Sequence, residues 1–161
     1  MHRIYSALIL FFILMPAYAE FDFDAYQTTS FADIKASHRD DLLKASQKSD
    51  YVISAATFKY RMTVTFTKKL RKLSANNKTV INAWQNALRV SDDFVNLYQY
   101  EFKAVFGKES YWIPVQEELL PHMGSELHAG DKFELYIIVI GAIKNRLVFL
   151  TTEFKSDRVP L

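Results

Sequence analysis

Hydrophobic positions change their spacing along the chain, and each spacing predicts a different element. Residues 58–66 alternate strictly between apolar side chains and lysine, arginine or threonine, which is the two-residue repeat of a strand with one buried face. Residues 31–48 and 78–89 instead carry apolar side chains at helical spacing, and Ser30 with Asp33 makes a capping-box pattern before the first of them. The first half of the chain is therefore predicted to hold a helix, a strand and a second helix.

The second half carries the pattern of two β-hairpins. Alternation over residues 94–105 is followed by a turn and the short apolar segment 111–115, in which Pro114 is expected to cut the second strand short because it lacks the N–H donor that a central strand requires. Residues 132–140 and 146–154 have the composition of the second hairpin. The two strands of a hairpin run antiparallel because a short turn joins them, so both hairpins predict antiparallel pairing.

Two further patterns complete the expected order of elements. Residues 117–129, between the hairpins, predict a short helix or a turn, and the continuous apolar run 135–140 predicts a central strand covered on both faces. We therefore expect an α+β fold in which two N-terminal helices lie around an antiparallel, hairpin-built sheet. A curled sheet and a small open barrel fit this order equally well.

Residues 1–19 have the pattern of a secretory signal peptide. Arg3 precedes an apolar run over residues 4–15, and Ala17 and Ala19 supply the small side chains that a signal peptidase selects. The apolar run is shorter than the roughly 20 residues that cross a bilayer core of about 30 Å. We therefore expect this segment to be cleaved and not to anchor the protein.

Cleavage would leave residues 20–161, a length typical of one globular domain without a transmembrane segment. The chain has no cysteine, although export delivers proteins to compartments where disulfides persist. Small secreted eukaryotic domains commonly depend on disulfides, so the composition favours a bacterial protein that is periplasmic or secreted.

Charge is unevenly distributed. The formal net charge is +2, yet residues 51–90 contain eight bases and no acid. The candidate polyanion-binding or membrane-binding residues within this block are Lys59, Arg61, Lys68, Lys69, Arg71 and Lys72. The alternative is that these bases pair with acids elsewhere on the surface, where single pairs contribute little. Nucleic acid is disfavoured as a partner by the export signal and because the interleaved aromatics point inward.

Two aromatic residues form the other candidate site. Tyr111 and Trp112 lie between a turn and Pro114, a position in which large rings with a polar edge can line a ligand groove. The competing interpretation is that both rings close the core of the sheet.

No catalytic, metal-binding or cofactor-binding residue is assigned. His122, Glu126 and His128 are residue types that ligate zinc or copper, but their spacing matches no known metal motif. Ser125 follows Gly124 but lacks the second glycine of a nucleophile elbow. No cofactor is therefore expected.

The sequence favours an exported, soluble, non-catalytic binding protein of the bacterial envelope, with a protein partner or a small ligand. A small periplasmic enzyme is the first alternative, its site assembled from loop residues such as His122, Glu126 and His128. Attachment to a polyanion or a membrane surface through residues 59–72 is the second. The sequence makes no prediction of oligomeric state.

Overall fold

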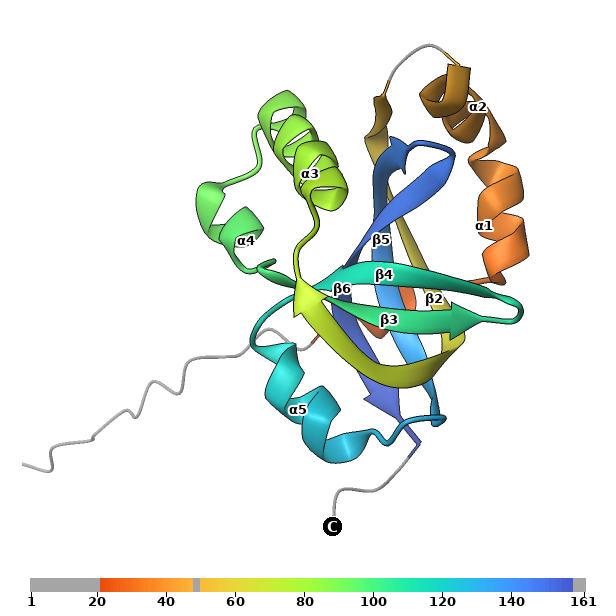
Figure 1. Ribbon diagram of the computed structural model, residues 1–161, viewed down its shortest axis with the longest axis vertical. Coiled ribbons are helices and arrows are strands. Elements are labelled where there is room, and N and C mark those ends of the chain that lie inside the picture. Colours follow the sequence, from red (N-terminus) through yellow and green to blue (C-terminus); the bar gives the residue numbers. More distant parts are fainter. Residues whose placement is uncertain (1–20, 48–49, 158–161) are drawn as a thin grey trace, which may run out of the picture.

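The computed structural model describes residues 21–47 and 50–157, so the predicted signal peptide lies outside the described residues. Within these ranges the fold is α+β, with five α-helices and a six-stranded open sheet (Figure 1). A short 3₁₀ helix, η1 (Phe23–Ala25), comes first. The helices are α1 (Phe31–Ser37), α2 (Arg39–Gln47), α3 (Ala75–Leu88), α4 (Asp92–Asn96) and α5 (Leu119–Glu126). The strands are β1 (Gln27–Thr28), β2 (Tyr51–Lys72), β3 (Tyr100–Phe106), β4 (Glu109–Val115), β5 (Lys132–Ile143) and β6 (Arg146–Ser156).

The strand order is β4-β3-β2-β5-β6, with every neighbouring pair antiparallel, and β1 adds to β2 in parallel. The long strand β2 joins both hairpins, since its first part pairs with β5 and its last part pairs with β3. The β3–β4 hairpin crosses in front of the β5–β6 hairpin (Figure 1), so the two outer strands approach each other. The rings of Tyr111 on β4 and Phe149 on β6 have their centroids 5.9 Å apart. Phe31 of α1 contacts both rings and thereby packs across this junction.

The sheet is covered on both faces, and β5 contributes to two separate hydrophobic clusters. Leu135, Ile137 and Val139 belong to the cluster that includes residues of α1, α2 and α5. Ile138 and Ile140 belong to the other cluster, with residues of α3 and α4. The prediction of a central strand covered on both faces is confirmed, because each side-chain parity of the apolar run meets its own set of helices.

The β5–β6 turn is tighter than expected. The apolar pattern left residues 141–145 between the strands, but the connection is Lys144 and Asn145, which have φ angles of 47° and 62°. Two consecutive positive φ angles are typical of a type I′ hairpin turn. Gly141 lies on β5 shortly before this turn. A glycine is required there because β2 passes very close: a Cβ atom would lie 2.2 Å from the carbonyl oxygen of Val52.

The expectation of two helices in the first half is not confirmed, since four α-helices precede β3 in the part of the chain that the structure describes. The capping Ser30 is correct: its hydroxyl accepts from the Asp33 N–H at 3.2 Å. The helix expected over 31–48 is divided at His38, whose ring is buried and contacts β2 through Tyr60. The packing of this ring against β2 is a tertiary contact, and the helical spacing of apolar residues does not predict it.

The strand expected to start at Phe94 also begins later. Ser91 caps α4 by accepting from the N–H of Phe94, and the acids Asp92 and Asp93 occupy the first helical turn, where they complement the helix dipole. The apparent alternation around Phe94 is therefore part of a short helix, and β3 begins at Tyr100.

Pro114 does not cut β4 short, since the strand continues to Val115; β4 is an edge strand of the sheet, where the missing N–H donor is tolerated. The segment between the hairpins, residues 117–129, was expected to form a short helix or a turn, and it contains the helix α5. No helix within the described ranges is both long and apolar enough to cross a membrane.

Candidate functional site

A cleft of about 200 Å³ lies where the two outer strands approach each other, and we call it the α3–β4 cleft. One wall is the end of β2 with the first turn of α3, the second is β4, and the third is the β5–β6 turn. The lining side chains are Arg71, Ser74, Asn76, Asn77, Tyr111, Trp112, Ile143, Lys144, Arg146 and Leu147. Three of these are bases and none is an acid.

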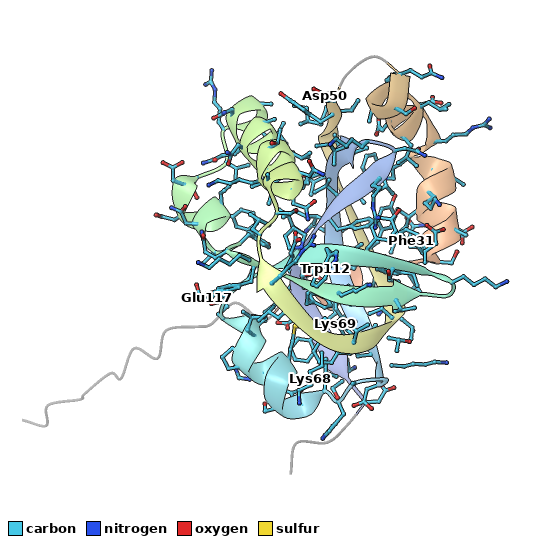
Figure 2. All side chains as sticks on the ribbon, in the orientation of Figure 1. Phe31, Asp50, Lys68, Lys69, Trp112 and Glu117 are labelled. Atoms are coloured by element: carbon cyan, nitrogen blue, oxygen red, sulfur yellow. The ribbon has the colours of Figure 1, made fainter. Side chains whose placement is uncertain are left out.

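Two arginine–aromatic pairs line the walls of the cleft. The Arg71 guanidinium carbon lies 4.0 Å from the centroid of the Trp112 ring, and the Arg146 guanidinium carbon lies 4.2 Å from that of Tyr111. Guanidinium groups attract the negative face of an aromatic ring at this separation. Each pair therefore fixes a positive charge and an aromatic ring together, and Trp112 lies at the front of the molecule on β4 (Figure 2).

Arg71 is held from behind by Glu101, which is completely buried. Oε1 of Glu101 accepts from Nε of Arg71 at 2.5 Å and also pairs with Nη2 of the same guanidinium. Oε2 accepts from the Ser74 hydroxyl at 3.1 Å and from the Asn77 amide at 2.5 Å. A buried carboxylate persists only when such donors replace the water it has lost. We call these four residues the Glu101 cluster.

Sequence reasoning missed Glu101. Alternation placed it on the wet face of the predicted strand, and that face is covered by Arg71, its direct cross-strand partner, and by the start of α3. The basic block drew attention to Arg71, but it does not identify which carboxylate on another strand lies opposite.

Side chains occupy the outer edge of β4 in the cleft. The carbonyl oxygen of Ser110 accepts from Nη2 of Arg146 at 2.9 Å, and that of Trp112 accepts from the Asn77 amide at 3.5 Å. An edge strand with free carbonyl groups invites pairing with another strand, and capping by side chains discourages it. Both side chains thus cover part of the edge of β4 inside the cleft.

Tyr111 and Trp112, the predicted ligand groove, both line the α3–β4 cleft. Their surroundings differ, since Tyr111 is 5% exposed and belongs to the core whereas Trp112 is half-buried. Burial raises the pKa of the Tyr111 phenol, and the nearby positive charge of Arg146 partly opposes this effect. Tyr111 therefore serves the core and the cleft together, while Trp112 serves the cleft wall.

The six candidate polyanion-binding bases are dispersed over several surfaces. Lys59 lies over the Tyr26 ring at 5.5 Å, and Arg61 donates to the Thr28 hydroxyl at 2.6 Å, so both contact the N-terminal segment. Arg71 lies in the α3–β4 cleft, and Lys72 lines a separate cleft of about 330 Å³ on the other side of α3.

Lys68 and Lys69 lie at a break in the β2–β3 register, where Lys68 has a φ of 59°. They line an apolar groove of about 140 Å³ beside α5. Figure 2 shows Lys68 next to α5 and apart from Trp112. The alternating pattern ended at Phe66, so Lys68 and Lys69 were expected just beyond the strand. Strand β2 instead continues to Lys72, and its two ends face different neighbours because the strand curves.

His122 and His128 each form a local pair with a carboxylate of the same segment. Nδ1 of His122 lies 3.9 Å from Glu126, and Nδ1 of His128 lies 3.6 Å from Asp131. Ser125 donates to the His122 carbonyl oxygen of its own helix. Within residues 21–47 and 50–157, no three His, Asp or Glu side chains are arranged to hold a metal ion.

Comparison with known protein families finds no family model that matches this chain, and comparison with curated proteins finds no significant sequence match.

Proposed function

We propose that the protein is an exported, non-catalytic binding protein of the bacterial envelope, and that the α3–β4 cleft is its ligand site. The observation that carries this proposal is the pair of fixed arginine–aromatic contacts, Arg71 with Trp112 and Arg146 with Tyr111, in the walls of one open cleft. Aromatic faces combined with a few placed polar groups are typical of small-ligand sites.

The connectivity of the sheet supports the same location. In chain order the five long strands are β2, β3, β4, β5 and β6, with α5 between the third and the fourth, β4 and β5. In the sheet these strands are antiparallel in the order β4-β3-β2-β5-β6, which is the connectivity of the OB-fold, a partly open barrel. Proteins with that fold bind ligands on the face of their second and third strands and at the loops joining strands one to two and four to five. Here those loops are the segment that contains α3 and the β5–β6 turn, two walls of the α3–β4 cleft. Fold likeness alone does not assign an activity, so the proposal depends on the side chains.

A cleft-filling variant tests the binding proposal. Asn76 is exposed on the first turn of α3 and lines the cleft, so Asn76→Trp is expected to obstruct it without disturbing the core. A thermal-shift screen of neutral, acidic and basic metabolites on residues 20–161 should give compounds that stabilise the native chain but not Asn76→Trp. Asn86→Trp, on the exposed last turn of α3, is the matched control and should keep every response. Equal responses in all three proteins would refute a ligand site in this cleft.

Export is tested separately. The protein isolated from its native cells should begin at Glu20 and appear in the periplasm or the medium. An intact Met1 terminus on protein from the cytoplasm would contradict this part of the proposal.

A further inference from the structure

We infer that the ligand of the α3–β4 cleft is a compact anion, a small molecule that presents a phosphate or a carboxylate group to Arg146 and Lys144. This inference rests on the proposed function of the cleft and specifies the chemical class of its ligand.

The charge of the lining supports an anion. Arg71, Lys144 and Arg146 line the cleft without any lining carboxylate. Two acids close to these walls are already engaged: Glu101 is buried behind Arg71, and Glu109 at the start of β4 accepts from Lys35 at 3.0 Å. The cleft is therefore electropositive, and a cation or a neutral ligand would leave this charge uncompensated.

The three bases have different roles. The Arg71 guanidinium binds Glu101 and stacks on Trp112, so it acts as a positioning residue for the wall. Arg146 uses one nitrogen, Nη2, for the Ser110 carbonyl oxygen, and among the described residues its guanidinium makes no ion pair with a carboxylate. Lys144 is exposed in the two-residue turn immediately before β6. Arg146 and Lys144 are thus the cations that can bind an incoming anion, because a guanidinium presents several donors suited to phosphate or carboxylate oxygens.

The size and the remaining lining restrict the rest of the ligand. A volume of about 200 Å³ is below the range of roughly 300–1,000 Å³ found for sites of drug-sized ligands. Trp112, Ile143 and Leu147 add apolar surface to the cleft. An anionic group on a single small ring, such as a phosphorylated or oxidised monosaccharide, has the matching size and chemistry.

Trp112 provides a direct reporter of binding. The chain has two tryptophans, and the other, Trp84, is buried in the cluster under α3. Its indole Nε1 has no hydrogen-bond partner among the described residues, so Trp84→Phe removes no such bond and leaves Trp112 as the sole indole. In this background, Trp112 fluorescence can be titrated with glucose 6-phosphate, glucuronate, inorganic phosphate, glucose and heparin at low ionic strength.

We expect saturable changes with glucose 6-phosphate or glucuronate, a weaker response to inorganic phosphate and none to glucose. Comparison of the two sugar anions distinguishes a phosphate site from a carboxylate site. Arg146→Gln should weaken binding at least about tenfold, since a hydrogen bond to a charged group contributes roughly 1.5–3 kcal/mol. The matched control is Arg39→Gln, the same substitution at an exposed position on α2, which should leave affinity unchanged.

The outcomes separate this inference from the proposed function. Equal binding of glucose and its phosphate, with no loss in Arg146→Gln but loss in Asn76→Trp, would overturn the anion and preserve the cleft as a site. Response to heparin but to neither sugar anion would replace a compact anion by a polymer. No response to any of these probes up to 10 mM would also overturn the inference, and the metabolite screen would then decide on the cleft itself.

Discussion

Two buried polar side chains near the start of β3, Glu101 and Tyr98, have opposite surroundings. Glu101 is charged and lies directly behind the wall of the α3–β4 cleft, bound by Arg71. Tyr98 is neutral and lies inside the protein, where its hydroxyl donates to the Thr151 carbonyl oxygen at 3.0 Å and accepts from the Gln116 amide at 3.1 Å. We call the second set the Tyr98 cluster.

The difference shows what each cluster contributes. A neutral, hydrogen-bonded cluster joins packed elements at little electrostatic cost, and here it ties β6 to the segment that follows β4. A buried ion pair gives little net stability compared with apolar packing, because both charges lose water. The Glu101 cluster is therefore better explained by the fixed position it gives Arg71 and Trp112 than by stabilisation of the fold.

Among the substitutions that test this comparison, Glu101→Gln should lower the unfolding free energy most. The amide that replaces one carboxylate oxygen faces donors and leaves Arg71 without its counter-charge, so the unfolding free energy should fall by about 2–4 kcal/mol. Urea denaturation of residues 20–161 measures this. Glu117→Gln, the same change at an exposed position, should stay within about 0.5 kcal/mol. Equal effects of the two substitutions would show that the Glu101 cluster has no special role.

Tyr98→Phe should have an intermediate effect. The ring still fills its site, but Gln116 loses an acceptor and the Thr151 carbonyl oxygen loses a donor, at a cost of about 1–2 kcal/mol. The same denaturation experiment with Tyr51→Phe, at a residue 38% exposed, is the control and should be nearly neutral. Binding in the cleft should survive Tyr98→Phe, whereas Glu101→Gln should weaken it. A loss of binding in Tyr98→Phe would break the distinction between the clusters.

Arg71→Lys should have a smaller effect on stability. Lysine keeps the positive charge but cannot contact Oε1 of Glu101 through two nitrogens or stack flat on Trp112, so a loss of about 0.5–1.5 kcal/mol is expected. The more direct measurement is a change in Trp112 fluorescence in the Trp84→Phe background. Arg39→Lys should change neither quantity, and an unchanged Trp112 spectrum in Arg71→Lys would mean that Arg71 does not position the indole.

The smallest expected effect is on the pH dependence of stability, and it is confined to alkaline solution. Burial raises the pKa of the Tyr98 phenol above its ordinary value of about 10. Above that pH the unfolded chain loses a phenolic proton that the folded protein retains, so stability falls as pH rises. Replacement by phenylalanine removes this contribution, so Tyr98→Phe should lose less stability than the native chain between pH 8 and 11. An identical loss in both proteins would show that Tyr98 does not contribute to alkaline unfolding.

Several local elements could be predicted because their causes are local. The Ser30 cap and the buried parity at Tyr60, Met62 and Val64 follow from hydrogen-bonding capacity and alternation. The limits of the helices were less accurate. Ser74 accepts from the N–H of Asn77 and starts α3 before the expected Lys78, because its cap includes residues that resemble a turn.

The candidate site was predictable only in part. Tyr111 and Trp112 were identified because large aromatics beside a turn suggest a groove, and Arg71 because it lies in a basic block. Arg146 and Glu101 had no such signal, since their importance depends on neighbours from other strands.

The sequence by itself determined an α+β chain, a central apolar strand and an excess of bases in residues 51–90, because side-chain spacing and charge are local properties. The tertiary structure alone decided that these bases disperse, that Glu101 is buried, and that β4 and the β5–β6 turn meet beside α3. The physical reason is the curvature of the sheet: it brings residues far apart in the chain within a few ångströms, and no periodicity in the sequence encodes that approach.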